Sequence, residues 1–142
     1  MELILWRHAD AEDGRDDMAR RLTPKGEQQA AAMAKWLRAH LPGPFTLLAS
    51  PAVRAQQTAR ALAVPITEKS LAPGATVAAI VKAAEKHRGV VIVVGHMPDL
   101  GRAAAELVAS AQTEWSVEKG AVWWLAGEAP ARIKAVLSPE LL

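Results

Sequence analysis

The 142-residue sequence contains no cysteine, which excludes disulfides, thiolate metal sites and cysteine nucleophiles. It also lacks an apolar run near the ~20 residues that a membrane helix needs, since its longest strongly apolar stretch is VVIVV. The opening segment MELILW has neither a basic region nor a long apolar core, so no signal peptide is predicted. We therefore expect a soluble, cytoplasmic protein that is not bound to a membrane.

Neither sign of charge is in large excess over the other. The formal net charge is only +2 at pH 7 and no long Lys/Arg run occurs, so nucleic-acid binding is not predicted. Hydrophobic residues make up 51% and charged residues 23% of the chain, the balance of a soluble globular protein. This length suffices for one domain with a real core, and we predict a single domain over residues 1–142.

Short apolar runs alternate with helical patterns along the chain. Three runs rich in large or branched side chains predict buried strands at residues 3–6, 45–49 and 90–94. Spacing of apolar residues at i, i+3, i+4 and i+7 predicts helices at residues 30–37, 77–84 and 100–107. The alanine-rich segment 54–63 also favours helix, by its propensity. Later, GAVWWLAG and RIKAVL predict a hairpin around the turn GEAP. This order predicts an α/β sandwich with a largely parallel sheet and an antiparallel C-terminal edge.

Helix starts carry chemical markers. Thr23 is predicted as an N-cap with Pro24 at the first helical position. Ser50 and Pro51 predict the same arrangement for the next helix. Pro98 is predicted to open the last one.

Cationic side chains follow the predicted parallel strands. The first strand ends in Arg7 and His8, and the third ends in His96. The second leads to Arg54, about one turn into the next helix. Ligands of open α/β sheets bind at the carboxyl ends of the strands, so these side chains should share one rim. With no local carboxylate, the cluster should be electropositive and bind a phosphoryl group, or free phosphate or sulfate.

An imidazole among cations can also attack phosphorus. The cationic surroundings keep it neutral and stabilise the negative charge of the transition state. Its second nitrogen must be oriented by an acceptor such as a backbone carbonyl.

Four segments, LWRHAD, RRLTPKG, SPAVRAQQTA and VVGHMP, resemble in that order the signature segments of the histidine phosphatase superfamily. The short length and RHAD are most similar to its phosphohistidine phosphatase (SixA-like) branch. The resemblance implies a three-layer α/β/α sandwich of the phosphoglycerate mutase-like fold. It also implies a phosphatase that needs neither a metal nor a cofactor.

The resemblance assigns roles to individual residues. His8 would attack phosphorus and become transiently phosphorylated, while Arg7 and Arg54 hold the phosphoryl oxygens. His96 would bind and polarise the phosphoryl group. The superfamily also supplies an arginine just before a Leu-Thr pair. Arg20 fits that spacing best, with its neighbour at position 21 as the alternative.

Superfamily members that cleave alkyl phosphates usually carry an acidic proton donor after the second helix. The corresponding segment PITEKSLAPGAT offers only Glu68, which nothing in the sequence places at the site. An alcohol leaving group benefits from such a donor by about 10²–10⁴-fold, whereas a phosphoramidate is intrinsically more labile. The sequence therefore favours phosphohistidine, or another substrate with an easily displaced leaving group, over phosphomonoesters, and we expect phosphohistidine on a protein.

The sequence is also compatible with other functions. The same site would serve a phosphomonoesterase or mutase acting on a small molecule, or a non-catalytic module that binds phosphate or a phosphoprotein.

The segment DAEDGRDDMARR is predicted to be a mobile loop that could gate access to the site. Asp99 is predicted to interact with the dipole of the last helix.

Overall fold

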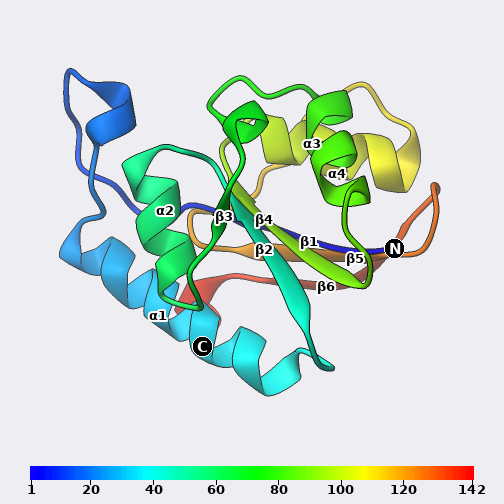
Figure 1. The fold of residues 1–142 in the computed structure, drawn as a ribbon, viewed down its shortest axis with the longest axis horizontal. Coiled ribbons are helices and arrows are strands. Elements are labelled where there is room, and N and C mark those ends of the chain that lie inside the picture. Colours follow the sequence, from blue (N-terminus) through cyan, green and yellow to red (C-terminus); the bar gives the residue numbers. More distant parts are fainter.

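The computed structural model describes residues 1–142 and contains one six-stranded sheet with the order β3-β2-β4-β1-β5-β6 (Figure 1). The strands are β1 (Glu2–Arg7), β2 (Phe45–Ala49), β3 (Ile66–Thr67), β4 (Val90–Gly95), β5 (Val122–Ala126) and β6 (Arg132–Leu137). The first four in the sheet order run parallel, whereas β5 pairs antiparallel with both β1 and β6. The predicted mostly parallel sheet with an antiparallel C-terminal edge is confirmed.

Helices cover both faces of this sheet. They are α1 (Pro24–His40), α2 (Val53–Arg60), α3 (Val77–Glu85) and α4 (Asp99–Ala109), with 3₁₀ turns at Asp17–Ala19, Lys69–Leu71 and Pro139–Leu141. In Figure 1, α1 and α2 lie on one side of the sheet and α3 and α4 on the other, which confirms the three-layer sandwich. None of the helices combines the length and apolar character needed to span a bilayer.

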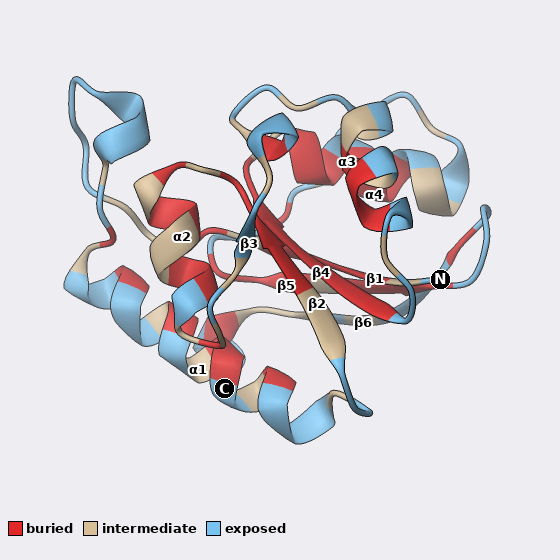
Figure 2. Cartoon of the chain, viewed as in Figure 1, coloured by how far each residue is buried: buried red, intermediate tan, exposed pale blue.

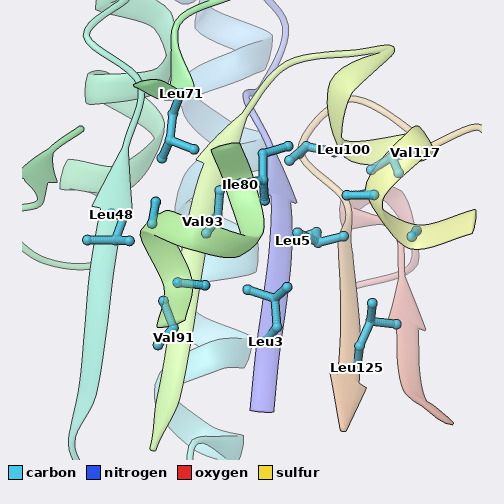
Figure 3. Close-up of a cluster of buried hydrophobic side chains, with 14 of the residues drawn as sticks. Leu3, Leu5, Leu48, Leu71, Ile80, Val91, Val93, Leu100, Val117 and Leu125 are labelled. Atoms are coloured by element: carbon cyan, nitrogen blue, oxygen red, sulfur yellow. The ribbon is translucent and has the colours of Figure 1, made fainter. Parts of the chain in front are cut away.

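The central strands are apolar on both faces because both faces are covered. Leu3 and Leu5 of β1 point into the core under α3 and α4, whereas Ile4 and Trp6 point into the core under α1 and α2. Figure 2 shows these strands as the most completely buried part of the chain, and Figure 3 shows the first core in detail. Burial of each large apolar side chain contributes roughly 1.5–3 kcal/mol. The two cores hold the carboxyl ends of the strands in fixed positions.

Two of the predicted helix starts are confirmed and one is wrong. Thr23 caps α1 through its Oγ1, which accepts a hydrogen bond from the backbone N–H of Gly26 at 3.0 Å. The helix α4 begins directly after Pro98, as predicted. The helix α2 begins only at Val53, and Ser50 does not cap it. The Ser50 hydroxyl lies instead against a histidine ring at the carboxyl end of β4.

Candidate active site

A cavity of about 340 Å³ lies where β1, β2 and β4 end. Its wall is mainly polar and is formed by Arg7, His8, Ala11, Asp17, Arg20, Arg54, Pro73, His96, Met97 and Lys119. The structure thus brings together the two histidines and three of the arginines predicted from the sequence. The ring centroids of His8 and His96 are 5.2 Å apart. Arg21, the alternative third arginine, is exposed and does not line this cavity.

His8 is buried directly after β1, with its ring orientation fixed by the backbone. Its Nδ1 lies 2.8 Å from the carbonyl oxygen of Ala9. Because a carbonyl oxygen only accepts, Nδ1 carries the ring proton and Nε2 keeps its lone pair free. Burial, together with the charges of the nearby arginines, lowers the pKa of His8 to about 4, against the raising effect of the Ala9 hydrogen bond. At pH 7 the imidazole is therefore neutral and has an unprotonated Nε2.

The backbone after β1 is tied to α2 by a buried hydroxyl. The N–H of Ala9 donates to Oγ1 of Thr58 at 3.0 Å, and the Thr58 hydroxyl donates to the carbonyl of Arg54 at 2.8 Å. Thr58 is fully buried, so water does not compete for either bond. One side chain thus positions the residue after His8 relative to the helix that carries Arg54.

The same loop is anchored to α1 through Asp10. One carboxylate oxygen of Asp10 accepts from the Thr23 hydroxyl at 2.7 Å, and the other accepts from Nζ of Lys119 at 2.9 Å. The hydrogen bonds of Lys119 and Thr23 hold the pKa of Asp10 below its usual range. Gly26 permits this contact, since a Cβ at that position would overlap the carbonyl of Asp10. The glycine of LTPKG therefore allows the loop that carries Asp10 to pack closely against the start of α1.

Arg54 lines the cavity and is only 4% exposed. Its Nη1 donates to the carbonyl oxygen of Asp17 at 2.6 Å, and its Nη2 donates to Oδ2 of Asp17 at 3.2 Å. Arg20 binds the other carboxylate oxygen of Asp17 at 3.1 Å. Hydrogen bonds from Arg20 and Arg54 hold the pKa of Asp17 below its usual range. The expectation of a cluster without a carboxylate is wrong, because the 3₁₀ turn Asp17–Ala19 brings one to the arginines.

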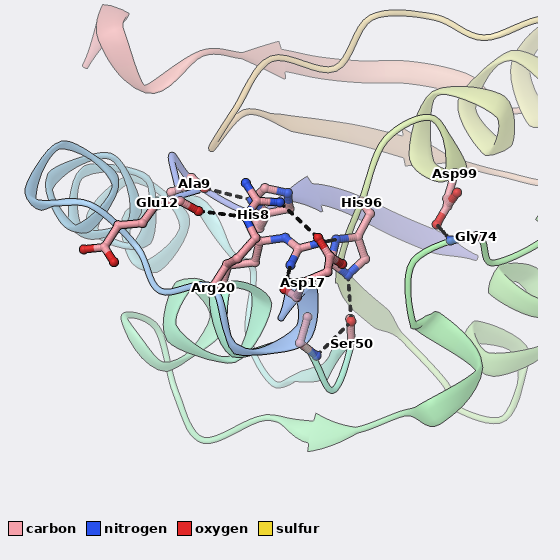
Figure 4. A network of polar contacts seen from close by, with 11 residues as sticks. His8, Ala9, Glu12, Asp17, Arg20, Ser50, Gly74, His96 and Asp99 are labelled. Carbon is pink, nitrogen blue, oxygen red and sulfur yellow. Dashed lines mark hydrogen bonds and ion pairs between the residues drawn. The ribbon is translucent and has the colours of Figure 1, made fainter. Parts of the chain in front are cut away.

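Arg7 and Arg20 are held by backbone carbonyls. Nη1 of Arg7 donates to Val117 at 2.9 Å, and its buried Nε has no hydrogen-bond partner. Burial lowers the pKa of Arg7, while the charge of Glu118 opposes the shift. Nε of Arg20 donates to the carbonyl of Glu12 at 2.7 Å, as the dashed lines in Figure 4 show. Both side chains line the cavity, and a backbone carbonyl holds each guanidinium group in place.

His96 follows β4 and is almost fully buried. Its Nε2 lies 2.7 Å from Oγ of Ser50, and its Nδ1 lies 3.3 Å from Nη2 of Arg54 (Figure 4). Burial, together with the charges of His8 and Arg54, lowers the pKa of His96 to about 3. His96 is therefore neutral at pH 7, so only one of its two ring nitrogens can donate a hydrogen bond.

Two acidic residues near the expected position of a proton donor are engaged elsewhere. Glu68 forms an ion pair with Lys86 at 3.1 Å and does not line the cavity. Asp99 lies in the first turn of α4 as predicted, but it is buried and accepts the backbone N–H groups of Gly74 and Ala75, each at 3.0 Å. Burial raises the pKa of Asp99. Its contacts secure the loop that carries Pro73 into the cavity wall, a role that its helix position alone did not indicate.

Other parts of the chain do not combine these features. A cavity of about 380 Å³ beside α4 is lined by Arg102 together with the carboxylates of Glu106 and Glu114, but by no histidine. No group of three or more histidine or acidic side chains is arranged to hold a metal ion. The cavity at the strand ends is therefore the candidate active site.

Comparisons with known proteins fit this geometry. The sequence model of the histidine phosphatase superfamily (branch 1) matches residues 3–71. An uncharacterized protein of Picosynechococcus sp. (strain PCC 7002) is 35% identical, over 99% of this chain and 93% of its own length. The structure of the protein histidine phosphatase SixA complexed with tungstate superposes with a TM-score of 0.84 and 25% identity, covering 99% of each chain. The chain belongs to the histidine phosphatase superfamily.

Within the superfamily, this histidine phosphatase is SixA-like. A candidate phosphohistidine phosphatase SixA of Nakamurella multipartitia superposes with a TM-score of 0.80 and 28% identity, covering 97% of this chain and 95% of the other. The phosphoglycerate mutase-like fold implied by the sequence is thereby confirmed. The same comparisons support phosphatase activity for this chain.

Proposed function

We propose that this phosphatase hydrolyses phosphohistidine on a protein, through a covalent intermediate on its own His8. The observation that carries the proposal is the state of the His8 ring. It is neutral, its Nδ1 donates to the Ala9 carbonyl, and its unprotonated Nε2 is available among arginines. A fixed imidazole with a free lone pair is a competent nucleophile for phosphoryl transfer.

The arginines supply the binding energy for the phosphoryl group. Arg7, Arg20 and Arg54 line one cavity, and guanidinium groups match phosphoryl oxygens in both charge and geometry. His96 lies beside Arg54 and adds a further contact to the phosphoryl group. The SixA structure with tungstate, an oxyanion that resembles phosphate, supports such binding in a related site.

Two displacements complete the reaction. First, the Nε2 lone pair of His8 attacks phosphorus while the bond from phosphorus to the substrate imidazole breaks, and the released nitrogen takes a proton from solvent. Water then attacks phosphorus, the bond to Nε2 breaks, and inorganic phosphate leaves with neutral His8 restored. The arginines stabilise the negative charge of both transition states, and neither step uses a metal ion or an organic cofactor.

The choice of substrate follows from the carboxylates near the site. Asp17 is the carboxylate that lines the cavity, and its arginine partners hold its pKa below the usual range. It is therefore deprotonated at pH 7 and is not a proton donor for a leaving alkoxide. Glu68 is bound to Lys86 instead. An imidazole leaves without the help that an alcohol needs, so a phosphoramidate suits this site better than an alkyl phosphate.

A comparison of substrates tests the proposal. The purified protein is given a phosphohistidine peptide and, separately, sugar phosphates and phosphoserine peptides. We expect kcat/KM to be about 10²-fold or more higher for phosphohistidine, as expected where a proton donor is missing. Faster hydrolysis of sugar phosphates would overturn the substrate assignment in favour of a small-molecule phosphomonoesterase.

The His8→Ala variant separates an enzyme from a binding module. It should lose turnover, while His87→Ala, shortly after α3 and away from the cavity, serves as the matched control. If the wild-type protein shows no turnover and His8→Ala binds the phosphopeptide with unchanged affinity, a non-catalytic module would be favoured.

A further inference from the structure

The wall of the cavity at the strand ends has an uncharged part. It consists of Ala11, Pro73 and Met97, whereas the other lining residues are charged or are histidines. Ala11 contributes only a methyl group, so Pro73 and Met97 are the two larger uncharged side chains. The arginines suit phosphoryl oxygens, which leaves the uncharged part for whatever the phosphoryl group is attached to.

Pro73 is held in this wall by a buried carboxylate. Asp99 is only 3% exposed, and its Oδ2 accepts the backbone N–H groups of Gly74 and Ala75, each at 3.0 Å; Figure 4 shows the bond to Gly74. Gly74 has a φ of +92°, so the chain turns sharply after Pro73. The N–H of Gly74 has no other partner, and that of Ala75 has a second bond only to Ala72 within the loop. Asp99 thus links the turn at Pro73 to the start of α4.

Met97 is held against the same helix. It follows His96 directly and packs against the core under α3 and α4. A Cβ at Gly101 would lie 2.8 Å from Cε of Met97 and would overlap the carbonyl oxygen of Trp115. Gly101 therefore leaves room for the end of the Met97 side chain beside α4. The first turns of α4 thus position both uncharged side chains.

We infer that Pro73 and Met97 form the surface that contacts the leaving imidazole of phosphohistidine, and that Asp99 is the positioning residue that keeps Pro73 in this surface. The inference rests on the proposed function, because it states where the substrate ring lies. A flat ring gains contacts with a proline ring and with the polarizable sulfur of methionine. The hydroxyl groups of a sugar phosphate would face apolar atoms there, which is unfavourable. The surface therefore adds a selectivity for the ring to the effect of the missing proton donor.

Two peptides that differ only in the leaving group test the surface. One carries phosphohistidine, and the other carries phospholysine at the same position, which keeps the phosphorus–nitrogen bond and the flanking residues but has no ring. In Pro73→Ala and in Met97→Ala, we expect KM for the phosphohistidine peptide to rise about 3- to 10-fold. For the phospholysine peptide, KM, or Ki if it acts only as a competitive inhibitor, should stay within about twofold.

The matched control for these variants is Pro44→Ala, at an exposed proline before β2 that does not line the cavity. It should match the wild type with both peptides. An equal rise for both peptides in Pro73→Ala and Met97→Ala, or no rise for the phosphohistidine peptide, would overturn the inference.

Variants of Asp99 test its positioning role. Asp99→Ala removes the acceptor of both N–H groups, so KM for the phosphohistidine peptide should rise about tenfold while the phospholysine peptide binds as before. Asp99→Asn keeps an oxygen acceptor and should restore KM to within about threefold of the wild type. Unchanged binding of the phospholysine peptide shows that each variant is folded. A loss of binding for both peptides alike would contradict a role specific to the ring.

Hydrogen exchange tests the placement of the loop without reference to activity. The amide of Gly74 should exchange slowly in the wild-type protein and about tenfold faster or more in Asp99→Ala. Equal exchange rates would overturn the role of Asp99 and leave the proposed function standing. Protection of Gly74 in a protein that hydrolyses no phosphohistidine would contradict the proposed substrate, and with it the surface for the leaving group, while supporting the link between Asp99 and the loop.

Discussion

The candidate active site has a buried half and an exposed half, and they meet at Arg54. The buried half consists of His8, Thr58, Ser50 and His96, all of which lie beneath the surface at the ends of strands or on α2. The exposed half is the 3₁₀ turn Asp17–Ala19, where the carboxylate side chain of Asp17 is 57% exposed.

The two halves hold their groups by different means. In the buried half, each hydrogen bond lacks competition from water, and an unpaired group costs about 1–3 kcal/mol. In the exposed half, ion pairs are screened and are worth about 0.2–1 kcal/mol each. We therefore expect the buried half to set the chemistry through fixed ring orientations, and the exposed half to adjust how tightly an anion binds.

Loss of the shared arginine should have the largest effect. Arg54→Ala removes a buried guanidinium that we propose binds the phosphoryl group, and we expect kcat/KM to fall by about 10²–10³-fold. Arg54→Lys keeps the charge but loses the planar fork, so it should recover only part of that loss. Steady-state kinetics on a phosphohistidine peptide measures both variants. Near wild-type kcat/KM in Arg54→Ala would show that Arg54 does not contact the phosphoryl group.

Acid should destabilise the fold through the buried histidines. The folded-state pKa of His8 is about 4 and that of His96 about 3, both below the ordinary value of 6.5. Between these values the unfolded chain binds protons that the folded chain does not, so stability falls as the pH falls below about 6.5. For His8 the loss is on the order of 3 kcal/mol by pH 4.

Urea unfolding at a series of pH values measures this loss. The His8→Ala variant should show a flatter decline between pH 6.5 and 4 than the wild type. Equal slopes in the two proteins would mean that His8 is not held in its neutral form.

Removal of the buried hydroxyl of Thr58 should have an intermediate effect. Thr58→Val keeps the shape of the side chain but leaves the N–H of Ala9 without its acceptor, so the free energy of unfolding should fall by about 1–3 kcal/mol. Thr113→Val, at an exposed position after α4, is the matched control and should change it by less than about 0.5 kcal/mol. Chemical denaturation measures both, and equal stabilities would contradict the tie between the loop and α2.

Neutralisation of the exposed carboxylate should have the smallest effect. Asp17→Asn removes a negative charge that competes with an anion for Arg54 and Arg20, so tungstate should bind about 2- to 5-fold more tightly. The gain should shrink in 1 M salt, where exposed charges are screened within about 3 Å. Calorimetry measures the affinity. Weaker binding in the variant would show that Asp17 orients the arginines instead of competing for them.

Much of the scaffold could be predicted because its signals are local. Apolar runs identified β1, β2 and β4, and the Thr23–Pro24 pair marked the start of α1. The strand β3 was missed, since its two residues, Ile66 and Thr67, are exposed and give no apolar pattern.

The errors at the site concern contacts between distant parts of the chain. Ser50 has the local signature of a helix cap, but its hydroxyl meets a histidine 46 residues later. Asp17 reaches Arg54 across 37 residues, from a polar segment with no periodicity. Side-chain contacts of this kind depend on how the loops pack, and neither spacing nor propensity encodes them.

Trapping of the phosphoenzyme tests the central claim most directly. The protein is mixed with a ³²P-labelled phosphohistidine peptide and quenched within a single turnover, and the labelled residue is mapped. A nucleophilic His8 predicts a label that is acid-labile and alkali-stable, confined to His8 and absent from His8→Ala. Turnover without any label on the protein, or a label on another residue, would contradict covalent catalysis by His8.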